Sequence, residues 1–254
     1  MIIRQFDLPH RFPRRVLLDA ETVPAEVGAA ECAGRSDLRD LLTVTIDGET
    51  ARDFDDAISV ERTPKGSWLL RVHIADVSHY VAEGGPMDRE AFARGTSVYF
   101  PGRVLPMLPE RLSNGICSLN PGVDRLAFTA VLEVSRQGRL LRHDFLEAVI
   151  HSDARLTYTQ VARALEGGDP GALPAVTGLA AMLAEARELA AALHAQRARR
   201  GSIDFDLPEE QILLDLQGNT ASTARSERNV AHRIIEELMI AANEAVAGYF
   251  TWLK

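Results

Sequence analysis

The sequence has only two cysteines, Cys32 and Cys117, and no apolar run long enough to cross a membrane. The spacing of the cysteines excludes a cysteine-based zinc site, and two distant thiols are typical of a reducing compartment. The lack of a long apolar run excludes a membrane-spanning helix. We therefore expect a soluble, cytoplasmic protein with no membrane partner.

A surplus of positive charge is also absent, since 28 Lys and Arg stand against 36 Asp and Glu, for a net charge of −8. This balance excludes a protein that coats nucleic acid through a broad basic face, so any RNA must enter a locally basic groove. There is no Gly-x-x-x-x-Gly-Lys-Ser/Thr phosphate loop, which argues against a nucleotide-driven motor. None of the seven histidines has metal-ligand spacing. The acidic surplus indicates a site that collects cations.

With 254 residues, 46% of them hydrophobic, the chain can bury one large core. Residues 1–40 are predicted to be an extended leader, because Pro9, Pro13 and Pro24 interrupt helices and the apolar residues lack a period. An irregular path is predicted for 98–109, which contains three prolines. Apolar alternation and turn signals predict strands at 41–46, 57–60, 68–75, 127–134 and 140–150, the last two joined across Gln137-Gly138.

The second half is predicted to be more helical. A short helix is expected at 87–95, a long one at 179–200 that ends at Gly201, and a last one that Ser226 caps. Apolar residues recur along this last helix at three- and four-residue steps, at Val230, Ile234, Leu238, Ala241, Ala245 and Tyr249. Strands followed by helices predict an α/β or mixed α+β fold, with a mostly antiparallel sheet flanked by helices.

Four aspartates, Asp47, Asp53, Asp55 and Asp56, fall within ten residues directly after a predicted strand. Two carboxylates ~4 Å apart repel by roughly 4 kcal/mol at a surface-like dielectric. The cluster therefore either splays into water as an acidic turn or holds a hard divalent ion, for which magnesium fits best. A calcium-binding EF-hand is excluded, because the loop counted from Asp53 has Ile58 at its sixth position and Pro64 at its twelfth.

The run from Thr45 to Ala57 resembles the signature of the RNB-type exoribonucleases, the family of ribonuclease II and ribonuclease R. Further matching segments follow in the family's order: Val72–Val81, Tyr99-Phe-Pro, Leu105–Pro109, Leu112-Ser, Cys117-Ser-Leu119, Ala154–Tyr158, Arg200–Asp206 and Ala231–Asn243. The similarity runs from about Leu41 onward. We therefore expect 41–254 to form the N-terminal part of an RNB-type catalytic domain.

The resemblance implies magnesium-dependent hydrolysis of single-stranded RNA from its 3′ end to nucleoside 5′-monophosphates. It assigns Asp47, Asp53, Asp55 and Asp56 to the magnesium site, with Asp55 as the main catalytic residue. It places Tyr99, Tyr158 and Phe205 along the RNA path, Arg155 against the RNA and Glu236 at the ribose of the 3′ nucleotide. Each aromatic residue has a rival interpretation as a core residue, and Glu236 as a solvated helix residue. Arg197, Arg199 and Arg200 suit phosphate contacts and a helix C-terminus equally well.

The sequence departs from the family in two ways. We find no β-barrel RNA-binding domain before or after the matched region, and no Thr-Ser-Pro-Ile-Arg type segment, whose arginine meets the scissile phosphate in the family. A fragment, a natural half that pairs with a second polypeptide and a degenerate relative all stay open. Two rival functions are a non-catalytic RNA-binding relative with a relic site and another metal phosphohydrolase. The apolar end 249–253 predicts a partner.

Overall fold

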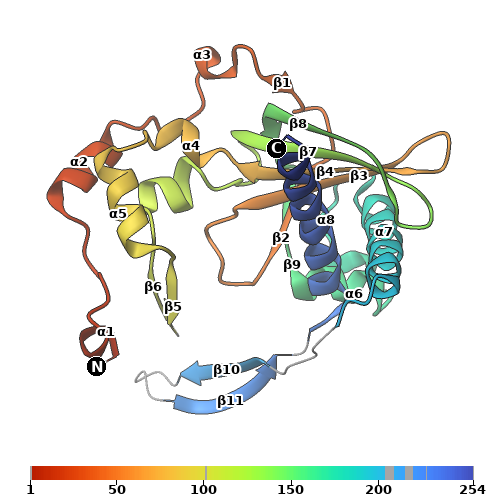
Figure 1. Cartoon of the computed structure of the whole chain (residues 1–254). Coiled ribbons are helices and arrows are strands. Elements are labelled where there is room, and N and C mark those ends of the chain that lie inside the picture. The colour runs from red at the N-terminus through yellow and green to blue at the C-terminus, as the bar shows by residue number, and fades with distance from the viewer. Residues whose placement is uncertain (1, 101, 204–208, 215–219, 227, 254) are drawn as a thin grey trace.

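The computed structural model describes residues 2–100, 102–203, 209–214, 220–226 and 228–253. Its centre is a seven-stranded sheet in the order β1-β8-β7-β4-β3-β2-β9 (Figure 1). The strands are β1 Ser36–Asp37, β2 Val44–Asp47, β3 Asp56–Arg62, β4 Trp68–Ala75, β7 Asp124–Val134, β8 Leu140–His151 and β9 Ala154–Thr157. Pairs β1–β8 and β2–β9 are parallel, and the other neighbours are antiparallel.

Apolar side chains aligned across the strands fix the register of the sheet. Val60 of β3 pairs with Leu70 of β4, which pairs with Leu132 of β7. Leu70 and Leu132 are fully buried. A slip of one residue would turn these side chains to the opposite face, so this register is strongly favoured.

Each face of the sheet has its own apolar core. Helices α6 Tyr158–Leu165, α7 Leu179–Arg199 and α8 Val230–Trp252 contribute to the first core, which includes Leu183, Ile234 and Leu70. The second core contains α2 Arg14–Glu21, α5 Pro86–Arg94 and the π-helical turn η1 Arg111–Ile116. Figure 1 shows α2 and α5 side by side on one flank and α7 beside α8 on the other.

The predicted class, a mixed α+β fold with a mostly antiparallel sheet, is confirmed. All five expected strands and the helices at 87–95 and 179–200 are present within a few residues. The turn between β7 and β8 contains Gly138, whose φ is +76°. A Cβ at this position would lie 2.1 Å from the carbonyl oxygen of Ala192 in α7, so only glycine fits.

The extended leader is wrong as a prediction. Residues 1–40 contain α1 Ile2–Gln5, α2, α3 Ala29–Cys32 and β1. Pro13 stands at the N-terminal end of α2 instead of interrupting it, and Val16 and Ala20, four residues apart, are buried in the second core. Helices this short are marginal alone, so tertiary packing stabilises them.

Two further predictions need correction. The last helix begins at Val230, where the Asn229 side chain accepts hydrogen bonds from the backbone N–H groups of Ala231 and His232; Ser226 ends strand β11. Strands β10 Glu209–Leu214 and β11 Thr220–Ser226 form a separate antiparallel pair. The segment expected to be irregular contains the paired strands β5 Val98–Phe100 and β6 Arg103–Leu105. No helix in the described part of the chain is long and apolar enough to span a membrane.

Candidate active site

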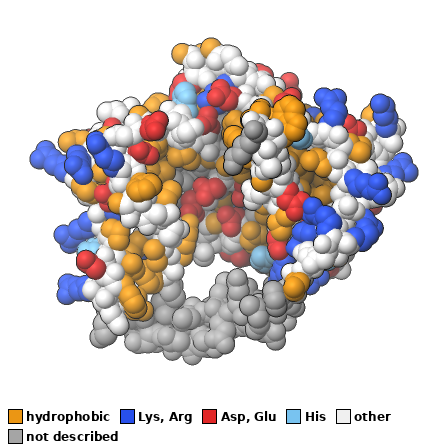
Figure 2. Space-filling model, viewed as in Figure 1, with side chains coloured by type: hydrophobic (Ala, Val, Ile, Leu, Met, Phe, Trp, Pro, Cys, Tyr) orange, Lys and Arg blue, Asp and Glu red, His pale blue; other side chains and the backbone are white. Residues whose placement is uncertain are grey.

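The acidic loop, residues 47–56, lies at one end of the sheet. Strand β2 ends at Asp47, which pairs with Thr157 at the end of β9, and β3 begins at Asp56, which pairs with Ile74 near the end of β4. Asp47 and Asp56 therefore lie beside Tyr158 at the start of α6, and Asp53 and Asp55 lie close enough to Asp47 for their charges to interact. Figure 2 shows acidic side chains gathered in the hollow at the centre of this face.

The carboxylates of this loop destabilise one another. Burial, together with the charges of neighbouring aspartates, raises the pKa of Asp47 and of Asp55. The pKa of Asp56 is raised to about 6, first by burial and then by the charges of Asp47 and Asp55. The charge of Asp53 acts on both Asp47 and Asp55. In the part of the chain that the structure describes, no Lys or Arg forms an ion pair with any of the four.

Residues from β9 and α6 hold the first half of the loop. Arg155 Nη2 donates hydrogen bonds to the carbonyl oxygens of Gly48, at 2.6 Å, and Glu49, at 2.9 Å. Thr159 Oγ1 donates to Glu49 Oε1 at 2.5 Å. Arg155 thus binds the loop backbone and lowers the repulsion around Asp47 by its charge. Its expected contact with RNA stays a prediction.

Two of the predicted tyrosines lie at the aspartates. Tyr99 Oη donates a hydrogen bond to Asp53 Oδ2 at 2.7 Å, although the tyrosine is 62% exposed. Tyr158 is the first residue of α6, and its pKa is raised to about 12 by burial and by the charges of Asp47 and Asp56. The core interpretation of Tyr99 is therefore wrong.

Sequence reasoning missed His232, which stacks on Tyr158. The two ring centroids are 3.9 Å apart and the rings are inclined by 19°. Asn229, the capping residue of α8, also donates a hydrogen bond from Nδ2 to the Tyr158 carbonyl oxygen at 3.4 Å. The available signal was position, because His232 lies inside the matched segment 231–243. The N-termini of α6 and α8 therefore meet beside the aspartates.

The two adjacent glutamates of α8 have different surroundings. Glu236 forms an ion pair with Arg228, and its side chain is 38% exposed. Glu237 is buried, and its carboxylate accepts hydrogen bonds from Arg197 and from His194. Glu236 is therefore the one that remains accessible to a ligand. The predicted residue Phe205 lies outside the described residues.

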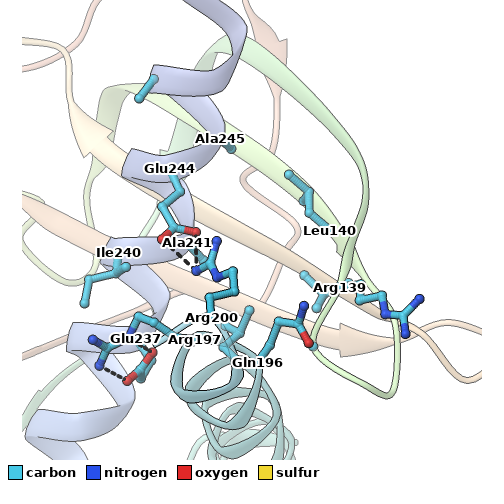
Figure 3. Close-up of a pocket in the computed structure, with 14 residues that line it drawn as sticks. Arg139, Leu140, Gln196, Arg197, Arg200, Glu237, Ile240, Ala241, Glu244 and Ala245 are labelled. Atoms are coloured by element: carbon cyan, nitrogen blue, oxygen red, sulfur yellow. Dashed lines mark hydrogen bonds and ion pairs between the residues drawn. The ribbon is translucent and has the colours of Figure 1, made fainter. Parts of the chain in front are cut away.

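The arginines at the end of α7 have protein partners. Arg197 pairs with Glu237, and Arg200 with Glu244. These pairs line a cavity of about 490 Å³ between α7, α8 and the β7–β8 turn (Figure 3). This turn lies at the opposite end of the sheet from the acidic loop, because β7 runs from beside Ala75 to beside Trp68. The structure thus favours ion pairing over the phosphate contact for Arg197 and Arg200.

The acidic loop has the donor chemistry of a magnesium site without its closed geometry. Carboxylate oxygens are the ligands that magnesium prefers, and a cation would relieve the repulsion that raises the three pKa values. No group of three or more His, Cys, Asp or Glu side chains among the described residues is arranged closely enough to hold a metal ion as it stands. Coordination of one ion by three or more of the four aspartates would therefore require their side chains to move.

Comparison with known proteins gives a consistent picture. Ribonuclease R of Thermotoga maritima is 48% identical over 98% of this chain, and that of Escherichia coli 46% identical over 97%. Ribonuclease R of Mycoplasma genitalium, solved in complex with ribose-methylated single-stranded RNA, superposes with a TM-score of 0.93 at 35% identity over 98% of this chain. Yeast Ssd1, a pseudonuclease, matches at 21% identity with a TM-score of 0.64, a likeness of fold alone.

The match covers only part of these relatives. The chain spans 35% of the Thermotoga protein, 30% of the Escherichia protein and 38% of the Mycoplasma chain. The RNB domain family matches residues 35–254, which is most of the sequence and includes every element of the acidic site. This chain belongs to the RNB domain family.

Proposed function

We propose that this chain carries the metal-binding part of a magnesium-dependent exoribonuclease, which hydrolyses single-stranded RNA from its 3′ end to nucleoside 5′-monophosphates. The observation that carries the proposal is the acidic loop. Its four aspartates meet without a cationic side chain paired to any of them among the described residues, and burial and mutual repulsion raise three of their pKa values. Such an arrangement costs stability, which makes it a candidate for function.

Asp47, Asp53, Asp55 and Asp56 would hold the magnesium ion. Bound there, magnesium would lower the pKa of a water molecule and neutralise charge on the phosphate. Asp55 is the most exposed of the four and is therefore the best placed to act on the reacting group. Tyr99 orients Asp53 through its hydrogen bond and keeps that carboxylate fixed.

The surroundings of the loop suit the 3′ end of an RNA. Tyr158, with His232 against one face of its ring, offers a platform for a base. Stacking contributes about 1–3 kcal/mol per base and accepts every base, as a general exonuclease requires. Glu236 is partly exposed on α8 and offers a carboxylate to a ribose 2′-hydroxyl, the group that distinguishes RNA from DNA.

A second polypeptide, or a further segment, would complete the catalytic domain. Phe128, Phe145, Tyr249 and Phe250 surround an apolar cavity of about 340 Å³, and Trp252 beyond it is 79% exposed. Exposed aromatic surfaces of this kind normally contact a partner. The chain spans about a third of its curated relatives. We assign this surface to the remainder of an RNB catalytic domain.

The test supplies that remainder. The chain is combined with the part of Thermotoga maritima ribonuclease R that lies outside its match, and single-stranded RNA labelled at its 3′ end is added. Magnesium-dependent release of nucleoside 5′-monophosphates is expected from the pair, and little from the chain alone, whose net charge of −8 does not favour RNA binding. RNA binding without any release by the pair would favour the non-catalytic relative.

A further inference from the structure

The segment Cys117-Ser-Leu119 has no role in the function proposed above, yet it contacts the acidic loop. It follows the turn η1, and Ser118 is fully buried. Ser118 Oγ accepts a hydrogen bond from the backbone N–H of Phe54 at 3.0 Å and donates one to the carbonyl oxygen of Arg52, also at 3.0 Å. One hydroxyl therefore binds the backbone on both sides of Asp53.

Neighbouring contacts make this attachment rigid. The backbone N–H of Leu119 donates to the Phe54 carbonyl oxygen at 2.9 Å, so Phe54 is held at both its backbone groups. The Phe54 ring is buried in the second core together with Leu112 and Leu119. Phe54 stands between Asp53 and Asp55, and its anchoring fixes the direction of both neighbouring carboxylates. The loop is thus fastened at its centre to a segment some sixty residues away in the sequence.

The backbone of Ser118 is fixed in turn by Arg125. Arg125 of β7 is buried, and its Nε donates a hydrogen bond to the Ser118 carbonyl oxygen at 2.8 Å. Arg125 Nη2 donates to the Gly115 carbonyl oxygen at 3.2 Å, at the end of η1. The chain of contacts runs from the sheet through Arg125 and Ser118 to the loop. Its effect is to hold mutually repelling carboxylates at a fixed spacing, which water-exposed side chains would not keep.

We propose that Ser118 is a positioning residue for the acidic loop, and this inference rests on the proposed function for its purpose. Alanine at this position leaves both backbone groups, of Arg52 and Phe54, without their buried partner. Loss of one such hydrogen bond corresponds to about a tenfold change in local opening. Supporting residues behind metal ligands change metal affinity by about tenfold or more when removed. Ser118→Ala should therefore loosen the loop and weaken magnesium binding.

The experiment compares the whole chain, Ser118→Ala and the control Thr129→Val. Thr129 of β7 is equally buried, and its Oγ1 is hydrogen-bonded to His73 Nδ1 at 2.9 Å, away from the loop. Hydrogen–deuterium exchange is first measured without magnesium, over peptides that cover 47–58 and, as a reference, helix α7. Exchange in the loop should be about tenfold faster in Ser118→Ala and unchanged in Thr129→Val.

Magnesium affinity is then measured by calorimetry with magnesium chloride alone. Ser118→Ala should bind about tenfold more weakly than the parent, and Thr129→Val as the parent does. Faster loop exchange in Ser118→Ala with no magnesium binding in the parent would support the positioning role and contradict the metal site. Unchanged loop exchange in Ser118→Ala would overturn the positioning role whatever the metal result. If Ser118→Ala fails to fold, Ser118→Thr, which keeps the hydroxyl, should retain the parent's loop protection, and its loss would contradict the proposal.

Discussion

The two ends of the central sheet shift the pKa values of their carboxylates in opposite directions. In the acidic loop, burial and neighbouring carboxylates raise the pKa of Asp56 to about 6. At the α7–α8 end, burial alone would raise the pKa of Glu237, but hydrogen bonds from Arg197 and His194 hold it below its ordinary value. Glu185 behaves like Glu237, because Arg62 and Trp68 donate hydrogen bonds to it.

The difference separates acids that stabilise the fold from acids that cost stability. Glu237 joins α7 to α8, and its hydrogen bonds with Arg197 and His194 favour its ionised form in the native state. The ionised forms of Asp47, Asp55 and Asp56 are disfavoured, because their pKa values are raised. Contacts from Arg155, Tyr99 and Ser118 nevertheless hold the acidic loop in place. Carboxylates held together against their repulsion are candidates for binding a cation, which is the role proposed for them above.

The largest effect is expected at the reacting centre. In the enzyme completed with the remainder of the domain, Asp55→Asn should lower kcat by at least about a hundredfold, as the loss of one preorganised charge-stabilising group does. The RNA dissociation constant should stay within about threefold, because the channel is unaltered. Single-turnover cleavage and filter binding measure the two quantities. Glu244→Gln, at the α7–α8 end of the sheet, serves as the control and should cleave RNA at the parent rate. A parent-like rate for Asp55→Asn would contradict the catalytic role of Asp55.

At the α7–α8 end of the sheet, where carboxylates form ion pairs, loss of a carboxylate should destabilise the fold. Glu237→Gln should lower the free energy of unfolding at pH 7 by about 3 kcal/mol, because Arg197 loses its buried counter-charge. The pKa of Glu237 is lowered in the native state, so its contribution is present above the ordinary glutamate pKa and is lost as the pH falls below it. Urea unfolding at pH 7 and pH 4 should show the deficit shrink at pH 4, and an equal deficit at both would contradict the ion pair.

In the acidic loop, loss of a carboxylate should stabilise the fold instead. Without magnesium, Asp56→Asn should raise the free energy of unfolding at pH 7 by roughly 1–3 kcal/mol, because a native pKa of about 6 against an ordinary 3.8 penalises the ionised form. The parent should lose this stability as the pH rises from about 4 through 6, and the variant should lose less, because only Asp47 and Asp55 then keep raised pKa values. Thermal unfolding from pH 4 to pH 7 tests it, and parallel curves would contradict the repulsion.

The smallest effect is expected at the base platform. Tyr158→Ala in the completed enzyme should lengthen the limit product or slow the final cleavages, and leave the first cleavages on a long RNA unchanged. A long RNA is held by many phosphate contacts, whereas a short remnant depends on stacking, at about 1–3 kcal/mol per base. Product ladders on a gel measure this. His232→Ala should give a weaker change in the same direction, and identical ladders for all three proteins would leave Tyr158 a packing residue.

Local sequence signals were enough for the strands and the long helices. The alternation in β4 and the glycine of the β7–β8 turn are visible without any tertiary information. Helix α2 was missed, because its eight residues form only by packing Val16 and Ala20 into a core built from distant segments. The start of α8 was misplaced, since Ser226 and Asn229 are both good capping residues and only the pairing of β11 decides between them.

For the site, too, the sequence predicted some residues, whereas other contacts are visible only in the fold. The aspartates are evident from their density, and the resemblance to a family ordered the other candidates. The role of Arg155 in binding the Gly48 carbonyl oxygen was not evident, because a backbone acceptor leaves no mark in the sequence. The contacts of His232 and Ser118 join segments far apart in the chain, which only the fold brings together.

Calorimetric titration of magnesium into the chain shows directly whether the acidic loop binds the ion. The parent should bind magnesium, Asp47→Asn and Asp56→Asn should each bind it more weakly, and Glu237→Gln should bind it as the parent does. This pattern would tie the ion to the end of the sheet where, among the described residues, no Lys or Arg forms an ion pair with the four aspartates. Equal magnesium affinity in the parent and both aspartate variants would contradict the account, because the acidic loop would then be no more than an acidic turn.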